Sequence, residues 1–438
     1  MSDLLARTLR AFDRAGLEYC VLRDADRLAD LAGGGEVDVL VAPGHLDALR
    51  RCAACAGFAE LPRWGHAPHH FFVAYDAAAD AWLKLDVVTA IAYGRPSHAW
   101  RTSLAGPCLA HRRRAAGAVG PAPEDGLVTL LLHCVLDKHA FPETDRARVR
   151  ALVAAVRDPG RVTDLLRAGG ATMWSAADVA AAVADERWSA LLAERAAIGA
   201  ELGRRAPLRT PARRWRDRVL RKADRARRCL RPHLPMVALL APDGAGKSSL
   251  AEGLARSFPF PVHMAYMGLY QQGSRRRAWS HVKGLGLAGH LATQWARYAV
   301  ARAQQGRDRL VVFDRYPYDA YLPAARREGA LRRARRWLLA RACPAPDMVV
   351  LLDAPGAVLY ARKGEHDPAA LEAARQRYLA LRAVLPRMTV VDATRPADRV
   401  RRDVIALIWR HVVDRGAGPR DDACAADAVA EGGAVGTP

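Results

Sequence analysis

Residues 241–249 read Ala-Pro-Asp-Gly-Ala-Gly-Lys-Ser-Ser and stand between an apolar run, Met236–Leu240, and a segment with helical periodicity, Leu250–Arg256. Glycines let the backbone curl so that successive N–H groups and the start of the next helix face one point. Such a curl binds phosphate groups, because Lys247 can reach their outer oxygens and Ser248 can ligate Mg²⁺. The alternative is a fortuitous glycine turn, which the intact Gly-Lys-Ser core and the flanking segments disfavour.

Three more apolar runs follow this loop, and helical segments rich in Arg, Ala and Leu separate them: Leu310–Phe313, Met348–Leu352 and Thr389–Val391. Short apolar strands that alternate with helices are typical of a parallel sheet covered on both faces. We therefore expect residues 235–415 to form an α/β domain, a P-loop NTPase parallel sheet flanked by helices.

Two of these strands end in an acid, in Asp314-Arg315-Tyr316 and in Asp353-Ala354-Pro355. In a parallel sheet both carboxylates lie at the edge where ligands bind, so either is a candidate for holding a metal ion. The alternative for each acid is the N-cap of the following helix. Arg315 beside Asp314 favours an anionic substrate.

Together these motifs resemble thymidylate kinases: Asp-Gly-Ala-Gly-Lys-Ser, Asp-Arg-Tyr, Leu-Asp-Ala-Pro, a basic Arg-Lys pair and Val-Asp-Ala follow one another across roughly residues 235–415. The resemblance implies that ATP is bound by Asp243, Gly244, Ala245, Gly246, Lys247, Ser248, Ser249 and Asp392. It implies that Ser248 and Asp314 hold Mg²⁺ and that Asp243 and Arg315 bind the acceptor. It also implies catalytic roles for Lys247, Asp314, Arg315, Arg362 and Lys363, the last two from a closing lid, although an ordinary exposed helix end is the alternative for that pair.

The chain departs from the thymidylate kinase pattern in three places. Ala241 replaces the first glycine of the phosphate loop, and Ala245 stands where some members carry Arg, so the lid would have to supply catalytic cations. The Arg-Glu-Pro-Gly-Gly stretch of the acceptor pocket is replaced by residues 264–270, followed by Arg275–Arg277. The acceptor is therefore expected to be a nucleoside monophosphate or another small phosphate or hydroxyl compound.

The first 200 residues have a different pattern. Four segments are expected to be strands, namely Glu18–Leu22, Val37–Val41, Phe71–Ala74 and Trp82–Val88, and two are expected to be helical, namely Asp125–Lys138 and much of Arg146–Ala200. This order predicts a small α/β unit followed by a helical extension.

Three acids of this region, Glu36, Asp38 and Asp86, are candidate metal ligands. Positions i and i+2 of a strand share a face, so Glu36 and Asp38 point the same way, and Asp86 on an adjacent strand can complete a cage for Mg²⁺. The pattern resembles the nucleotidyltransferase superfamily, but Arg23-Asp24 replaces its usual glycine-serine. An active transferase, a binding-only version and unrelated strand-end acids all stay open.

Four histidines of this region are also candidates. Because no Cys or matched acid stands near His66, His69 and His70 in the sequence, we expect a loop with solvent-facing imidazoles. His133 is expected to be a buried histidine with its hydrogen bonds satisfied, with a position facing the carboxylates as the alternative.

Composition limits the remaining classes of protein. The 438 residues include 67 Lys+Arg and 46 Asp+Glu, a net charge of +21, and thirteen of these cations but only three of the acids lie in residues 201–235. We expect an Arg-rich linker at 201–234, with a polyanion surface as the alternative, and a disordered tail at 416–438. No stretch reaches the roughly 18 apolar residues of a membrane span, so the expected address is cytoplasmic.

The sequence thus predicts an ATP- and Mg²⁺-dependent kinase at 235–415 behind a nucleotidyltransferase-like domain at 1–200. One alternative makes the N-terminal carboxylates the principal site, with the kinase domain accessory. A second alternative is a non-enzymatic, nucleotide-gated binding protein that works through the basic linker, for which nucleic acid is a possible but disfavoured partner.

Overall fold

The computed structural model describes residues 2–23, 25, 28, 34–61, 68–115, 118–268, 285–322, 329–364, 367–385 and 387–416. Asp24, His66, residues 269–270, Arg275–Arg277 and the tail from 417 lie outside the described residues. The chain forms two compact units, one comprising residues up to Asp224 and the other Arg225–Asp414. Within the described residues, none of the helices combines the length and apolar character needed to cross a membrane.

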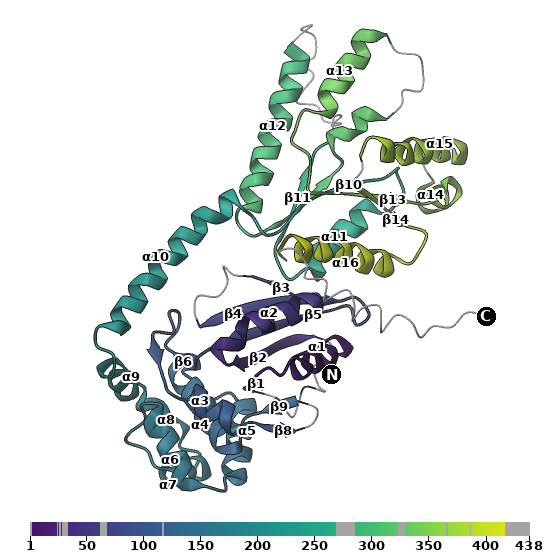
Figure 1. The fold of residues 1–438 in the computed structure, drawn as a ribbon. Coiled ribbons are helices and arrows are strands. Elements are labelled where there is room, and N and C mark those ends of the chain that lie inside the picture. Colours follow the sequence, from purple (N-terminus) through teal and green to yellow (C-terminus); the bar gives the residue numbers. More distant parts are fainter. Residues whose placement is uncertain are drawn as a thin grey trace, which may run out of the picture. The chain divides into compact units, whose positions relative to one another are not determined.

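The elements of the first unit, in chain order, are α1 (Asp3–Arg14), β1 (Tyr19–Val21), β2 (Gly35–Val41), η2 (Pro43–His45), α2 (Leu46–Cys55), β3 (Ala59–Glu60), β4 (His69–Asp76), β5 (Ala81–Val88), β6 (Ala92–Tyr93), β7 (Trp100–Arg101), α3 (Ala105–Ala110), β8 (Arg113–Ala115), β9 (Ala118–Gly120), α4 (Pro123–His133), η3 (Cys134–Lys138), α5 (Glu143–Ala155), α6 (Pro159–Ala168), α7 (Ala176–Ala184), α8 (Trp188–Ala193), α9 (Arg195–Arg204) and α10 (Arg209–Leu230), which continues into the second unit (Figure 1).

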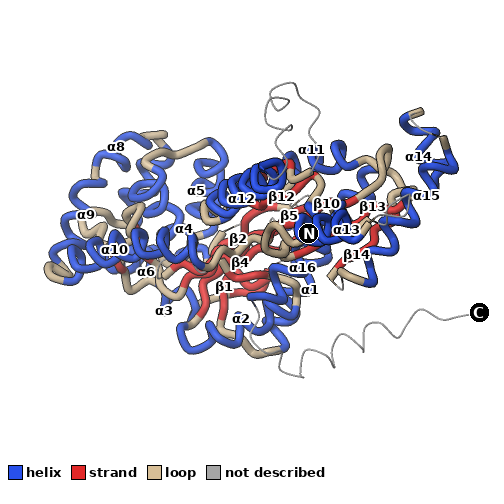
Figure 2. Tube along the Cα trace, turned by 90° about the horizontal axis from the view of Figure 1, so that it is seen from above, coloured by secondary structure: helices blue, strands red, loops and turns tan. Residues whose placement is uncertain are grey.

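The first unit contains a mixed five-stranded sheet in the order β1-β2-β5-β4-β3, in which only the β2–β5 pair is parallel. Its two faces are covered differently. Leu5, Leu9 and Phe12 recur at helical spacing on α1 and pack with α2 against one face. On the other face, Cys20, Leu40 and Val88 belong to one hydrophobic core with residues of the helices α3 to α9. Figure 2 shows α3 and α4 beside the strands of this sheet.

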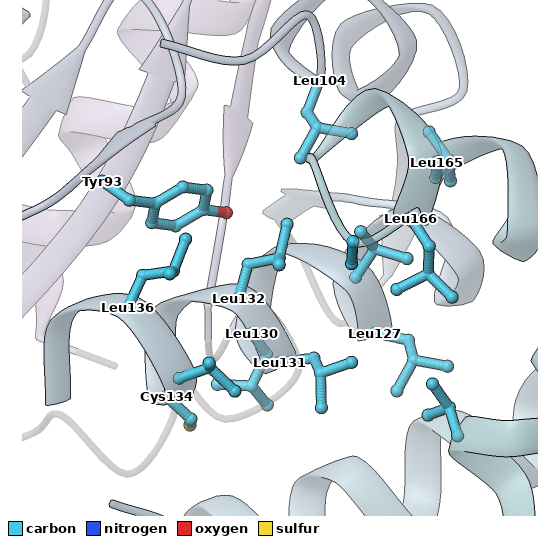
Figure 3. Close-up of a cluster of buried hydrophobic side chains, with 14 of the residues drawn as sticks. Tyr93, Leu104, Leu127, Leu130, Leu131, Leu132, Cys134, Leu136, Leu165 and Leu166 are labelled. Carbon is cyan, nitrogen blue, oxygen red and sulfur yellow. The ribbon is translucent and has the colours of Figure 1, made fainter. Parts of the chain in front are cut away.

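The helical extension has its core on α4. This helix carries apolar residues on every side and is buried over its last ten positions, as expected of a helix surrounded by others. Figure 3 shows its leucines gathered with Leu165 and Leu166 of α6, Leu104 and Tyr93. The segment predicted as one helix, Asp125–Lys138, changes at Cys134 into a π-helical turn, and His139 in left-handed conformation (φ +56°) ends it.

The second unit consists of β10 (Met236–Leu240), α11 (Lys247–Ser257), β11 (Val262–Tyr266), α12 (Leu285–Gln305), β12 (Leu310–Asp314), η5 (Pro317–Tyr321), α13 (Ala330–Ala340), β13 (Met348–Asp353), α14 (Gly356–Lys363), α15 (Pro368–Leu379), η6 (Ala380–Ala383), β14 (Met388–Asp392) and α16 (Ala397–Gly416).

All pairs in the sheet of the second unit are parallel, and its order is β11-β12-β10-β13-β14. Alternate residues of β10 pack against α12, η5 and α15, and α11 and α16 meet each other through Gly253 and Arg401. This is an α/β unit with a parallel sheet flanked by helices, compatible with a P-loop NTPase fold. The four apolar runs predicted as strands form β10, β12, β13 and β14.

Candidate functional site

The loop between β10 and α11 curls at two glycines. Gly244 (φ +86°) and Gly246 (φ +89°) are in the left-handed region, and a Cβ on Gly244 would lie 2.8 Å from the backbone oxygen of Leu359 in α14. Gly246 is the N-cap of α11 and supplies no side-chain hydrogen bond to the first turn. The N–H groups at the start of α11 are therefore available to an anion, and the helix dipole favours one there.

Lys247, the first residue of α11, lies across this loop. Its ammonium donates to the carbonyl oxygens of Ala241 (2.8 Å) and Pro242 (3.0 Å) and lies 4.0 Å from an Asp243 carboxylate oxygen. Burial lowers the pKa of Lys247, and the charge of Asp243 opposes that shift. Ala241 stands where the motif has its first glycine. Among the described residues, Ala241 is not one of those with a positive φ, so its side chain causes no backbone strain at this position.

Asp314 ends β12 at the same edge of the sheet. It pairs in parallel register with Leu239, two residues before the loop begins, and its charge acts on Lys247. Its Oδ1 atom is buried and has no hydrogen-bond partner within the described part of the chain. A buried carboxylate oxygen without a donor is unfavourable unless a cation occupies the space beside it.

Arg315 connects the strand end to the loop. Its guanidinium donates to Asp243 at 3.0 Å and lies 3.8 Å from Asp319, a residue that the sequence analysis did not single out. Asp319 in turn accepts from the Tyr378 hydroxyl at 3.3 Å, and burial raises the pKa of this carboxyl against the opposing charge of Arg315. In the sequence, the only indication of this ion pair was that Asp319 follows Arg315 by four residues.

The second strand-end acid, Asp353, has a different role from the one considered for it. Both of its oxygens accept from Arg375, at 2.7 and 2.9 Å, so the carboxylate is engaged in a two-pronged ion pair. Asp353 is not an N-cap either, because the N-cap of the following helix α14 is Pro355. In the same way, the N-cap of η5, the helix that follows Asp314, is Tyr316. The N-cap alternative was therefore wrong for both acids.

Arg362 and Lys363 lie in the last turn of α14, and both are exposed. Arg362 donates to the Thr394 carbonyl oxygen at 3.4 Å. The helix ends at Gly364, which is left-handed (φ +67°). Because Leu359 of the same helix touches Gly244, these two cations are carried by the helix that abuts the phosphate loop.

The remaining predicted nucleotide contacts lie along this edge. Ser248 and Ser249 are exposed in the first turn of α11, and Ala245 is buried. Asp392 ends β14 and accepts from the Thr394 amide (2.9 Å) and hydroxyl (2.6 Å), which lower its pKa. Asp392 therefore shapes the turn after β14.

The first unit brings its three predicted carboxylates together. Asp38 of β2 pairs directly with Asp86 of β5, and Glu36 lies two residues before Asp38 on the same face. One ligand oxygen from each lies within 4.8 Å of the others, a spacing that suits a metal ion. The structure thus groups the three acids as the strand periodicity predicts.

Each of these carboxylates also has a cationic or imidazole partner. Lys84 lies 2.9 Å from Glu36, Arg23 lies 3.0 Å from Asp38, and His69 lies 2.8 Å from Asp86. The expectation for His69, a solvent-facing ring without a matched acid, was therefore wrong. Phe71 pairs with Asp86 across the β4–β5 ladder, so His69, two residues along on the same face, lies diagonal to that acid.

A second layer of side chains supports this cluster. Arg23 contacts the His133 Nε2 atom at 3.2 Å, and the His133 Nδ1 atom contacts Asp137 at 3.2 Å. Burial lowers the pKa of His133. Asp137 also accepts from the Gly94 amide at 2.8 Å. His133 is thus buried with its hydrogen bonds satisfied, and it reaches the carboxylates through Arg23.

His70 shows the same departure from the solvent-facing expectation, because its ring lies 3.3 Å from a Glu60 carboxylate oxygen and 3.3 Å from Arg50. That expectation was therefore wrong for His70 as well. These contacts belong to a separate group on β3, β4 and α2, and they do not involve the three carboxylates.

No family model matches the chain, and no curated protein matches it. Among solved structures, thymidylate kinase from Candida albicans is similar with a TM-score of 0.33 and 16% identity, over 41% of this chain and 93% of that one. Similarity at this level adds no evidence on activity or substrate.

Proposed function

We propose that the second unit is an ATP- and Mg²⁺-dependent kinase that transfers a phosphoryl group to a small acceptor. One observation carries the proposal: the start of α11, the Lys247 ammonium and the Asp314 oxygen lie at one edge of a parallel sheet, and among the described residues the helix start has no side-chain cap and the oxygen has no donor. Phosphoryl transfer needs donors that bind phosphate oxygens and an acid that holds a metal ion, and this edge offers both.

The residues present fit Mg²⁺. Asp314 offers a buried oxygen that lacks a donor in the described chain, and Ser248 offers an exposed hydroxyl at the first turn of α11. These are hard oxygen ligands of the kind that Mg²⁺ prefers. When bound, the ion neutralises charge on the phosphate groups. The protein's own contribution is Lys247, which would exchange its contacts with two loop carbonyls for phosphate oxygens.

The acceptor side is proposed to be formed by Arg315 and Asp243. Arg315 offers a fork of donors suited to a phosphate or carboxylate, and its contacts with Asp243 and Asp319 hold that fork in place. A nucleoside monophosphate or another phosphate or hydroxyl acceptor fits this arrangement. Arg362 and Lys363 would add charge from α14 as it closes and excludes water.

Lys247→Ala tests the proposal, with ADP formation from ATP measured against a panel of nucleoside monophosphates, sugars and sugar phosphates. We expect turnover to fall by roughly a thousandfold, because the variant loses a preorganised charge at the reacting phosphates. Lys222→Ala is the matched control, since Lys222 is an exposed lysine of α10. Near-normal turnover in a folded Lys247→Ala protein would refute the assignment.

A second function is supported by the carboxylate cluster of the first unit. We propose nucleotidyl transfer there as the alternative, because three acids at metal-ligand spacing can activate a hydroxyl and stabilise leaving pyrophosphate. Release of pyrophosphate from a nucleoside triphosphate should be abolished by Asp38→Asn and unaffected by Lys247→Ala. The reverse pattern would remove this candidate.

A further inference from the structure

A small cavity lies where the start of α10 packs on the β6–β7 hairpin of the first unit. It has a volume of about 220 Å³ and is lined by Ser97, His98, Arg101, Arg213, Arg216, Asp217 and Leu220. Pockets that enclose a drug-sized ligand measure roughly 300 to 1,000 Å³. This cavity therefore suits a compact charged group, with the rest of a larger ligand outside it.

The lining carries an excess of positive charge. Arg101, Arg213 and Arg216 face one carboxylate, Asp217, and that acid already accepts from Arg221 at 2.7 Å. Within the described chain, neither Arg101 nor Arg216 has a carboxylate partner. Burial lowers the pKa of Arg101 to about 10, and the charges of the other two arginines add to that shift. Three guanidinium groups gathered in this way are stabilised by an anion.

The arginines are held in place by contacts of α10 with the hairpin. Arg213 donates to the Ala99 carbonyl at 3.2 Å, and Arg221 donates to the Pro96 carbonyl at 2.5 Å. Arg214 stacks its guanidinium over the Trp100 ring at 5.6 Å. These three contacts hold this part of α10 against the hairpin, and the first of them also fixes the Arg213 side chain in the cavity wall.

His98 connects this cavity to the carboxylate cluster. The residue lines the cavity, and its Nδ1 atom is buried and has no hydrogen-bond partner in the described part of the chain. Its ring centre lies 4.2 Å from that of His69, which contacts Asp86. Two imidazoles thus separate the arginine-lined cavity from the three acids.

We propose that Arg101, Arg213, Arg216 and His98 form a binding site for a phosphate group, separate from the phosphate loop of the second unit. The bound group is inorganic phosphate or pyrophosphate, or the phosphate end of a nucleotide that extends toward the carboxylates. The site requires no catalysis by either unit, so it is tested by binding alone.

The experiment is isothermal titration calorimetry on the full chain without metal ions, with pyrophosphate as the probe and inorganic phosphate and ATP as further arms. Wild type should bind two equivalents of pyrophosphate, one at each site. Arg216→Gln should weaken one of them by roughly tenfold, the loss of one charge-assisted contact, and Lys247→Ala should weaken the other. Arg218→Gln is the matched control, because it removes the same charge from an exposed position of α10 outside the cavity.

The outcomes separate the proposal from its rivals. Equal weakening by Arg216→Gln and Arg218→Gln would show a diffuse effect of net charge and would overturn it. The proposal would also be overturned if wild type bound a single equivalent of pyrophosphate and Lys247→Ala abolished that binding. A single equivalent that still binds to Lys247→Ala would support the proposal. Tighter binding of ATP than of pyrophosphate at the site lost in Arg216→Gln would identify a nucleotide, and equal binding would identify the inorganic ion. Because Arg216 is exposed, its variant should fold, and Arg101→Met provides a second test at the half-buried arginine of the cavity.

Discussion

The two candidate sites of this chain balance charge in opposite ways. At the phosphate loop, Asp314 keeps a buried oxygen without a donor in the described chain, and the first turn of α11 is uncapped. In the carboxylate cluster, each of the three acids already contacts a Lys, Arg or His of the same unit. The phosphate loop therefore has polar groups without partners in the described chain, whereas the acids of the carboxylate cluster have partners within the protein.

This difference predicts how each site responds to a ligand. A ligand at the phosphate loop replaces few protein contacts, of which the Lys247 bonds to two carbonyls are the main ones. A metal ion at the carboxylate cluster has to compete with Arg23 and Lys84 for the carboxylates of Asp38 and Glu36. Preorganised polar groups bind with little rearrangement, whereas satisfied groups first have to lose their partners.

The sharpest test compares two strand-end acids of the same sheet. Asp314→Asn should lower turnover of ATP by roughly a hundredfold or more while stability is unchanged or rises, because the change removes the charge of a carboxylate whose buried oxygen has no donor in the described chain. Asp353→Asn should lower the free energy of unfolding by about 1 to 3 kcal/mol, since it removes the carboxylate charge and replaces one of the two oxygens that accept from Arg375 with an amide NH2. Steady-state kinetics and urea unfolding measure the two effects.

A large stability loss in Asp314→Asn would contradict this contrast, because it would mean that Asp314 holds the fold and not a ligand. Unchanged turnover in a folded Asp314→Asn protein would remove the metal role proposed for that residue.

The second prediction concerns acid sensitivity beside the carboxylate cluster. Burial lowers the pKa of His98 to about 4, and the nearby His69 adds to that shift. Below its ordinary pKa, the unfolded chain takes up a proton that folded His98 does not, so stability falls as the pH drops from about 6.5 to 4, by up to about 3 kcal/mol. His98→Asn should remove this loss, and Asn suits the left-handed φ of +44° at that position. Urea unfolding at pH 7 and pH 4.5 measures it.

His139→Asn is the control, because His139 is also left-handed (φ +56°) and is exposed. The same flattening of the pH profile in both variants would show that the effect does not come from His98.

The contrast between the sites was only partly predictable. The phosphate loop could be identified because its function depends on consecutive residues, and the strands that flank it are uninterrupted apolar runs. β11 was missed because it is an edge strand whose residues are half-exposed, with Met264 exposed, so no apolar run marks it.

The sequence did not predict the contacts between residues that lie far apart in the chain. The spacing of Glu36 and Asp38 predicts a shared face, but Arg23, Lys84 and His69 reach these acids through strand register and loop geometry that local sequence does not encode. The pairing of Asp353 with Arg375 spans 22 residues and depends on the packing of α15 on β13. Composition marked α10 as basic without indicating which arginines face a cavity.

The third prediction concerns the backbone of the phosphate loop. Gly244→Ala places a side chain at φ +86° and a Cβ 2.8 Å from the Leu359 oxygen, so both conformation and space oppose it. We expect a loss of about 2 kcal/mol in stability and roughly tenfold weaker ATP binding. Gly16→Ala is the control, because Gly16 (φ +63°) has no neighbour within 4 Å and should cost only the conformational part, about 1 kcal/mol. Equal losses of stability in Gly244→Ala and Gly16→Ala would show that contact with α14 does not restrain the phosphate loop.

The smallest expected effect tests whether built-in partners limit metal binding at the carboxylate cluster. Arg23→Gln removes the cation 3.0 Å from Asp38 and keeps a side chain that can still donate to His133. Mn²⁺ affinity, measured by titration calorimetry, should rise by roughly threefold to tenfold, because the ion no longer competes with a partly exposed guanidinium for that carboxylate. Arg114→Gln is the matched control, since it breaks an exposed ion pair with Asp13 in the same unit and changes net charge equally. If Mn²⁺ binding weakens in Arg23→Gln alone, Arg23 orients Asp38 for the metal instead of competing with it, and the two sites then share the property of preorganisation.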